Sequence, residues 1–254
     1  MNNKKNLKEE IFKISAITDR GQRLNKFVAP IYQEKLKEIE DLINSLLEYK
    51  IEITEENLSG EWELIYSNVE LFRSSPFFQS IEIALDNKIR SDLFFKLHQL
   101  QVGSFGLSSI GRVAQKIDFK NKEFVSSFDT TIFGLTTIPI IGWFKLLPTF
   151  GGRVTTLADE LILEKSKITM KLKKTKIVEV KGLNKIPLFS NILMDKWYPV
   201  NEVWKRLPWN KSAPYCETSV VYLDEDLRIM KDIYGSTFIY IRGNKPFIKN
   251  EVNE

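Results

Sequence analysis

Apolar residues near the start of the chain recur with the period of an α-helix. Leu7, Ile11 and Ile14 are spaced by four and three residues, and a second set with similar spacing follows Pro30. The second set consists of Tyr32, Leu36, Ile39, Ile43 and Leu46. The two sets predict two amphipathic helices, separated at Asp19-Arg20-Gly21. Such helices either pack on their own domain or present an apolar face to a partner or a membrane surface.

From Ser59 onward, apolar and polar positions alternate, which is typical of β-strands. Trp62, Leu64 and Tyr66 are predicted to share one face of a first strand. Further strand-like stretches lie at 111–119, 123–131, 153–163, 168–180, 218–223, 227–231 and 236–242. Turn signals between them are Asn121-Lys122, Gly151-Gly152, Lys165-Ser166, Asp224-Glu225-Asp226 and Tyr234-Gly235. About eight short strands with hairpin-like links predict an antiparallel barrel or sandwich.

The stretch from Pro76 to about Leu97 is apolar with helix-like spacing, and it falls between the first two predicted strands. No internal repeat and no linker rich in Pro, Gly or Ser divides the chain, so one main domain is expected. We therefore expect a helical segment at 1–57, a mostly β domain at 58–245 and a flexible tail at 246–254.

Composition excludes several classes of protein. Of the 254 residues, 43% are hydrophobic and 28% are charged, which predicts a globular protein with a substantial core. A net charge of +4 is too small to indicate a nucleic-acid binder. Cys216 is the only cysteine, so no intramolecular disulfide forms and a reducing compartment is favoured.

The sequence also lacks the usual membrane and targeting signals. No apolar run is long enough to span a bilayer. The N-terminus has no apolar signal core, and Glu9 and Glu10 argue against a transit peptide. We expect the chain to work in the compartment where it is made, or to be a mature form.

Residues that could support catalysis are scarce. His98 is the only histidine, it follows an apolar segment, and no G-x-S-x-G motif accompanies it, so a buried or capping imidazole is favoured over a catalytic one. One His and one Cys cannot form an ordinary zinc site. The acidic triplet at 224–226 lacks the EF-hand pattern and fits a solvated hairpin turn. Gly103, Gly106 and Gly111 match no nucleotide-binding motif. We expect no enzyme, no metal and no cofactor.

Two features favour contact with lipid. The segment 138–148 is apolar, contains Trp143 and Phe144, and is bracketed by prolines. It suits a lid at the mouth of a barrel or an interfacial insertion, and equally a buried strand with its loop. Lysines are concentrated at 165–181, where Lys167, Lys171 and Lys173 share a strand face. That face meets anionic lipid or is merely solvated.

Several longer blocks carry a resemblance to a known family. Gly60-x-Trp62 resembles the first motif of lipocalins, although this short motif is common by chance. The whole run Leu58–Ser67, followed by Phe72-Arg73-Ser74-Ser75-Pro76-Phe77-Phe78, is similar to the N-terminal signature of the plastid lipid-associated protein/fibrillin (PAP/fibrillin) family. The blocks Ile110–Asp118, Tyr222–Ile229 and Gly235–Arg242 resemble its central strand and closing motif, and Thr18-Asp19-Arg20-Gly21 its helical lead-in.

This resemblance implies a lipocalin-like barrel in a non-enzymatic protein of lipid bodies or photosynthetic membranes. The expected location is peripheral, on thylakoids or lipid bodies of a cyanobacterium, or in the plastid stroma or plastoglobule. The expected partners are lipid surfaces and small hydrophobic molecules such as isoprenoids, carotenoids, quinones or acyl lipids. The alternatives are a coat protein with a filled barrel and no ligand, or a small lipid hydrolase or isomerase using His98 or paired carboxylates.

The barrel also predicts where a ligand would lie and how one end closes. A closing strand antiparallel to the first brings Arg242, with Arg228 in reserve, to the Trp62 indole beside Gly60. The alternative is that Arg242 is an ordinary surface residue. The expected lining of the cavity is aromatic or apolar: Trp62, Leu64, Tyr66, Phe77, Phe78, Phe128, Phe238 and Tyr240.

Overall fold

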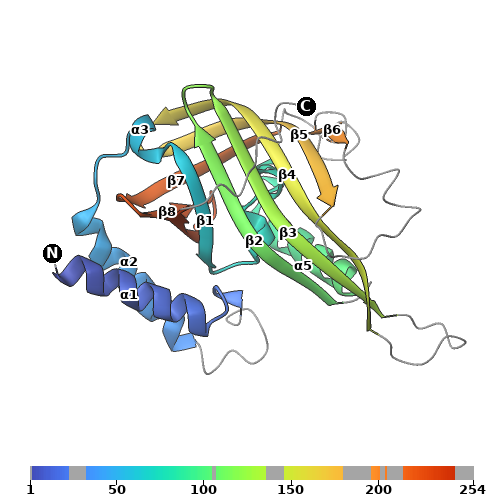
Figure 1. The fold of residues 1–254 in the computed structure, drawn as a ribbon, viewed down its shortest axis with the longest axis horizontal. Coiled ribbons are helices and arrows are strands. Elements are labelled where there is room, and N and C mark those ends of the chain that lie inside the picture. The colour runs from blue at the N-terminus through green and yellow to red at the C-terminus, as the bar shows by residue number, and fades with distance from the viewer. Residues whose placement is uncertain are drawn as a thin grey trace, which may run out of the picture.

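The computed structural model describes residues 2–22, 33–104, 107–135, 146–179, 196–200, 204 and 214–243. Within these residues, eight antiparallel strands close into a barrel, and two long helices precede the first strand (Figure 1). The predicted fold class, a mostly β protein with a helix-preceded antiparallel barrel, is therefore confirmed.

The helices and strands follow one another closely along the described chain. The helices are α1 (Asn2–Ile17), α2 (Gln33–Leu46), α3 (Glu55–Leu58), α4 (Pro76–Leu85) and α5 (Lys88–Ser104), with 3₁₀ turns η3 (Leu47–Tyr49) and η4 (Leu71–Ser74). The strands are β1 (Gly60–Ser67), β2 (Leu107–Asp118), β3 (Glu123–Leu135), β4 (Leu146–Glu164), β5 (Lys167–Glu179), β6 (Trp197–Pro199), β7 (Tyr215–Leu223), β8 (Leu227–Lys231) and β9 (Thr237–Arg242).

The barrel closes because its first and last strands pair. β1 pairs with β2 on one edge and with β9 on the other, and the remaining strands follow in the order β3, β4, β5, β7, β8. β7 pairs with the first part of β5, at Lys167–Lys171, whereas the short β6 pairs with Lys174–Lys176. All of these pairs are antiparallel, as the hairpin-like turns predict.

The predicted strand boundaries differ most at Gly151-Gly152. The sequence pattern predicts a turn there, but both glycines lie inside β4 and pair with Thr131 and Thr130 of β3. Glycine weakens a strand without forbidding it, so a glycine pair alone does not end one. β4 consequently begins at Leu146, and it includes the last residues of the apolar 138–148 segment.

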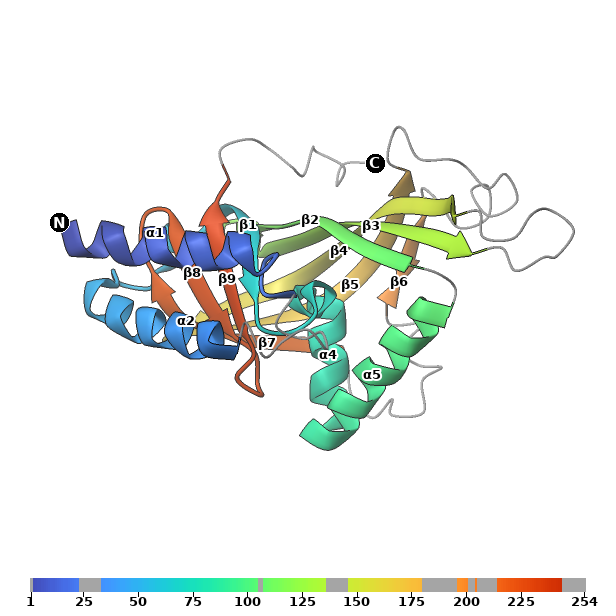
Figure 2. The same cartoon turned by 90° about the horizontal axis from the view of Figure 1, so that it is seen from below.

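Helices α1 and α2 pack on the outside of the barrel, over β8 and β9 (Figure 2). Their buried residues form one cluster with outward-facing side chains of the strands: Ile11, Ile14, Ile39, Ile43, Leu46, Tyr66, Tyr222, Leu227, Ile229 and Ile239. The helical apolar faces are thus covered by the chain's own barrel, one of the two alternatives that the pattern left open.

Tyr66 departs from the predicted pattern. The register between β1 and β9 shifts between Leu64 and Tyr66, which is the signature of a β-bulge. As a result Tyr66 lies opposite Ile239 and joins the outer cluster beneath the helices, while Trp62 and Leu64 belong to the barrel core. The prediction that all three share one face is therefore wrong at Tyr66.

A turn after α1 ties the helices to the barrel. Gly21 has a φ of +86°, and a Cβ there would lie 2.0 Å from the carbonyl oxygen of Ser67. The Arg20 guanidinium donates to the carbonyls of Gly111 at 2.6 Å and Ile110 at 2.7 Å. This turn therefore connects two of the blocks that carry the family resemblance, because Arg20 of the helical lead-in forms hydrogen bonds with the central strand β2.

A second anchor joins α1 to the turn between β7 and β8. Asp224 is buried and contacts the Nζ atoms of Lys4 at 2.8 Å and Lys8 at 2.7 Å, and the Tyr222 hydroxyl donates to it at 2.6 Å. Burial raises the pKa of Asp224, but these hydrogen bonds outweigh it and hold the pKa well below its ordinary value. The acidic triplet is a hairpin turn, as expected, but its first residue is buried and ion-paired, not solvated.

Candidate functional site

One end of the barrel is sealed around Trp62. The Arg242 guanidinium carbon lies 4.2 Å from the indole centroid, inside the roughly 6 Å range of a cation–π contact. Its nitrogens donate to the carbonyls of Asn57 at 2.7 Å, Ser59 at 2.9 Å and Glu225 at 2.7 Å. Gly60 makes room for it, since a Cβ at Gly60 would lie 2.8 Å from Nη1 of Arg242.

A second arginine reaches the same indole from inside the barrel. Arg228 is fully buried, and its guanidinium carbon lies 4.9 Å from the Trp62 ring and 4.4 Å from the Tyr240 ring. Nη2 donates to Oε1 of Gln115 at 2.6 Å, while Nε and Nη1 have no acceptor. Burial lowers the pKa of Arg228 to about 9, so the group remains charged at neutral pH.

Gln115 links Arg228 to Tyr240 and Ser74 through hydrogen bonds. Its side-chain nitrogen donates to the Tyr240 hydroxyl at 2.9 Å and to the Ser74 carbonyl at 3.1 Å. Burial also raises the pKa of Tyr240 to about 12, so its hydroxyl stays protonated. The result is a buried polar group in which one positive charge has no carboxylate partner among the described residues.

A narrow void lies beside this group. It measures about 210 Å³ in total, and no part of it is wide enough to admit a water molecule. Its described lining comprises Gln79, Gln115, Phe124, Met170, Thr218, Met230, Phe238 and Tyr240. The described side chains thus leave only a narrow space at this point of the barrel, between Gln79 of α4 and the partners of Arg228.

The predicted lining residues fall into three groups. Phe238 and Tyr240 line the void. Trp62, Leu64 and Phe128 belong to the surrounding core, and Phe77 and Phe78 pack on that core from α4. Tyr66 lies outside the barrel. The strand alternation could have indicated Met170, Met230 and Thr218, but nothing in the sequence indicates Gln79 or Gln115.

Helix α4 covers the void and brings several titratable groups together. Glu82 accepts hydrogen bonds from Arg73, at 3.0 Å from Nε and also from Nη2. Burial, followed by the nearby Asp232, raises the pKa of Glu82 to about 8. Cys216 donates to Gln79 at 2.9 Å, and burial raises the pKa of its thiol, so it is not a poised nucleophile.

Helix α5 lies beyond α4, on the side away from the barrel core (Figure 2). One face is anchored by Phe95, which is buried and stacks against Phe72, Phe78 and the Arg73 guanidinium. The opposite face carries a row of exposed apolar side chains at a spacing of four residues: Ile89 at 79%, Leu93 at 56% and Leu97 at 56% exposure. We call these three residues the α5 apolar row.

Charged residues flank the α5 apolar row. Lys88, Arg90 and Lys96 are exposed on the same helix, against the single carboxylate of Asp92, which Lys88 approaches to 2.6 Å. An exposed apolar row with basic neighbours is the arrangement of helices that lie in a lipid–water interface. His98 follows in α5, but its side chain lies outside the described part of the chain.

The predicted lysine face lies on the outer surface of β5, where carboxylates offset its charge. Lys167 contacts Glu217 at 2.8 Å, Lys171 contacts Glu160 at 2.8 Å and Lys173 contacts Asp159 at 3.2 Å. Trp143 and Phe144, the other predicted membrane contacts, lie outside the described residues.

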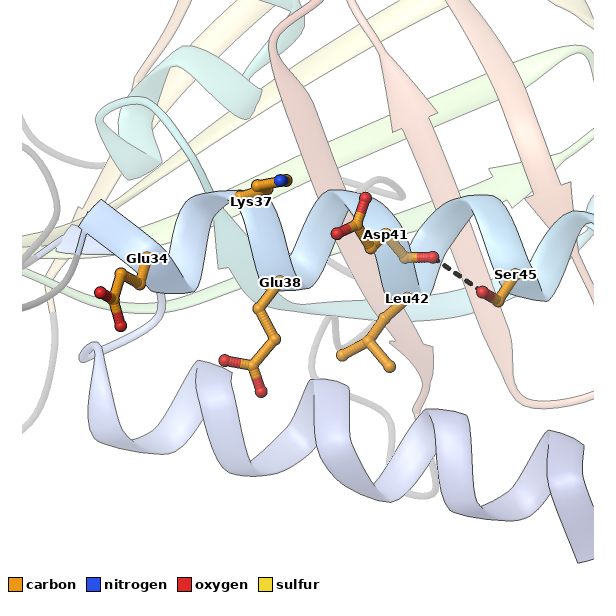
Figure 3. A pocket seen from close by; sticks show the side chains of 6 residues that line it. All are labelled: Glu34, Lys37, Glu38, Asp41, Leu42 and Ser45. Carbon is orange, nitrogen blue, oxygen red and sulfur yellow. Dashed lines mark hydrogen bonds between the residues drawn. The ribbon is translucent and has the colours of Figure 1, made fainter.

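The remaining surface features support no chemistry. A shallow hollow on α2 is lined by Glu34, Lys37, Glu38, Asp41, Leu42 and Ser45 (Figure 3). In the described ranges, no group of His, Cys, Asp or Glu side chains is arranged to hold a metal ion. None of the described helices combines the length and the apolar content that crossing a bilayer requires.

Comparison with known proteins gives one match. The PAP_fibrillin family model matches residues 5–241, which is nearly the whole chain. No curated protein and no solved structure matches it.

Proposed function

Because the chain belongs to the PAP_fibrillin family, whose members are in general non-enzymatic, lipid-associated proteins, we propose that it attaches to lipid surfaces through the α5 apolar row. We further propose that its barrel accepts a small hydrophobic molecule without turnover. The compartment we propose is the one the family favours, on thylakoids, plastoglobules or other lipid bodies.

The observation that carries the attachment is the exposure of the α5 apolar row. Three large aliphatic side chains are exposed to water on one helix face, although Phe95 of the same helix is buried. Exposure of these side chains to water is unfavourable, and their burial in a lipid surface would lower the free energy. The basic neighbours would add electrostatic attraction to anionic headgroups.

The lysine face, with Trp143 and Phe144, is a second proposed contact. Its carboxylate partners weaken its attraction for anionic lipid, so we expect it to contribute less than α5. A salt series separates the two contacts, because added salt screens charges and leaves apolar insertion intact.

The barrel part of the proposal rests on the apolar interior and the void beneath α4. The void is too narrow for a water molecule, whereas usual ligand sites measure roughly 300–1,000 Å³. A ligand would therefore have to open it, and a slender chain needs less opening than a carotenoid or a prenyl quinone. A coat protein with a permanently filled barrel is the competing function, and the narrowness of the void favours it. The paired carboxyl groups that an enzyme would need, Glu82 and Asp232, are not among the described residues lining the void.

Vesicle binding tests the attachment. A variant with Ile89→Ser, Leu93→Ser and Leu97→Ser should lose roughly a hundredfold in partitioning onto phosphatidylglycerol-containing vesicles, from about 3 kcal/mol of lost apolar burial. The matched control is Ile162→Ser, because Ile162 on β4 is also exposed, at 48%. Equal partitioning of the triple variant and the control would refute attachment through α5.

A further inference from the structure

The buried Arg228 guanidinium lacks the partners that a buried charge normally has. Of its nitrogens only Nη2 has an acceptor, Oε1 of Gln115, whereas Nε and Nη1 have none. Its two aromatic neighbours, Trp62 and Tyr240, offer ring faces and no further acceptor for these groups. A buried charge without a counter-ion is strongly destabilising, and a buried donor without an acceptor adds to that cost.

The nearest charges do not relieve Arg228. Burial lowers the pKa of Arg228, and Arg242, which is also positive, lowers it further. The buried carboxyl groups among the described residues are engaged elsewhere: Glu82 with Arg73, Asp224 with Lys4 and Lys8, and Asp232 with the backbone amides of Tyr234 and Ser236. In the part of the chain that the structure describes, the Arg228 guanidinium therefore has N–H donors without acceptors and no carboxylate beside it.

The void marks a place beside Arg228 where the packing is incomplete. Its lining includes Gln115 and Tyr240, two of the residues that contact the Arg228 guanidinium, and Gln79 of α4. Its apolar lining consists of Phe124, Met170, Met230 and Phe238. Methionine side chains adapt easily to a guest, so Met170 and Met230 are the residues best able to widen the void.

We propose that Arg228 binds the carboxylate of a single-chain fatty acid, and that Met170 and Met230 move apart to admit its acyl chain toward α4. This inference rests on the proposed function and names the class of its barrel ligand. A carboxylate would accept from the free guanidinium N–H groups and neutralise the charge, and Gln115 and Tyr240 would hold the guanidinium in place. Because the void is too narrow even for water, its lining has to shift to admit any ligand, and a slender acyl chain needs a smaller shift than a ring system.

The test is calorimetric titration of the delipidated full chain with three ten-carbon amphiphiles below their micelle concentrations. Decanoate should bind at least about tenfold more tightly than decanol, which is the factor expected from one charge-assisted hydrogen bond. Decyltrimethylammonium, which brings a second positive charge to Arg228, should bind most weakly. In Arg228→Met the three affinities should converge to within about twofold, because the apolar contacts remain and the charge is gone.

Two further variants keep the test decisive. Lys120→Gln removes an exposed cation from the turn after β2 and should leave the preference for decanoate unchanged. Arg228→Lys keeps the charge and should retain part of the preference, which provides a result even if Arg228→Met does not fold.

The outcomes separate this inference from the proposed function. Equal binding of decanoate and decanol by the native chain would overturn the role of Arg228 and leave a purely apolar barrel ligand standing. A preference for decanoate that persists in Arg228→Met would also overturn it. Absence of binding by all three amphiphiles would refute the barrel ligand altogether, while attachment through α5 is measured separately on vesicles.

Discussion

Arg242 shows at the scale of one residue how the barrel is sealed. Its guanidinium covers Trp62 at 4.2 Å and donates to three backbone carbonyls from two separate chain segments. Arg242→Ala should therefore destabilise the fold by about 2–3 kcal/mol, well beyond the roughly 0.5 kcal/mol usual for surface changes. Urea unfolding measures this, with Arg90→Ala as the control.

A double-mutant cycle isolates the stacking contribution. Combined with Trp62→Phe, Arg242→Ala should cost less than the sum of the two single changes, because residues in contact are coupled. Strict additivity would mean that Arg242 acts through its backbone carbonyls alone.

Glu82 predicts a pH dependence of stability. Burial and the neighbouring Asp232 raise its pKa to about 8, from 4.5 in the unfolded chain. Between these values the folded chain holds a proton that the unfolded chain releases, so this group lowers stability as pH rises through that window. Glu82→Gln mimics the protonated carboxyl, so it should remove this decline and be more stable than the native chain near pH 9 and equal to it near pH 5.

Urea unfolding at several pH values between those limits provides the measurement. The free energies of unfolding of the native chain and of Glu82→Gln could instead change with pH in the same way. In that case the carboxyl of Glu82 is ionised in the folded state and the predicted pH dependence is wrong.

At the scale of elements, the turn that follows α1 holds the helical pair on the barrel. Gly21→Ala should destabilise by about 2 kcal/mol or more, because the new Cβ would clash with the Ser67 carbonyl in addition to the strain of a positive φ. Gly235 is the matched control, since it has nearly the same φ, +85°, and nothing within 4 Å of its Cβ position. Gly235→Ala should cost only the strain, about 1 kcal/mol.

The comparison is made by thermal and urea unfolding of the two variants. Similar losses for both would show that α1 can shift away from β1 without penalty, contrary to a rigid attachment.

The elements also show how far the sequence alone could lead. Alternation and turn residues predict the eight barrel strands, and antiparallel closure follows because the first and last strands frame the domain. The bulge at Leu64–Tyr66 could not be predicted, since one extra residue changes the facing of Tyr66 without changing composition. The exposed face of α5 could not be predicted either. Apolar residues lie on both faces of that helix, so their periodicity does not identify the outer face.

The burial of Arg228 was harder to predict than its contact with Trp62, for which the sequence placed it in reserve behind Arg242. Arg228 alternates with Leu227 and Ile229, which places it on the same face as Met230. Because arginine is almost never fully buried, the ordinary expectation for such a residue is a solvated position. Only the packed structure shows that this face points into the barrel and that two guanidinium nitrogens lack acceptors.

At the scale of the whole molecule, the two helical additions have different roles. Helices α1 and α2 cover the outer barrel wall and are anchored through Asp224 and Arg20. Helix α5 is anchored through Phe95 and leaves its apolar row in water. Among the described residues, the barrel core is thus closed, its outer wall is covered by α1 and α2, and the α5 apolar row is exposed.

The most direct test of attachment through that face uses a probe on α5. The only cysteine, Cys216, is buried, so Leu93→Cys and the control Ile162→Cys can each be labelled selectively with an environment-sensitive fluorophore. On addition of phosphatidylglycerol-containing vesicles, emission from position 93 should shift to shorter wavelengths as the probe enters an apolar phase, and emission from position 162 should not. A shift at position 162 alone, or none at position 93 while the protein floats with the vesicles, would contradict attachment through α5.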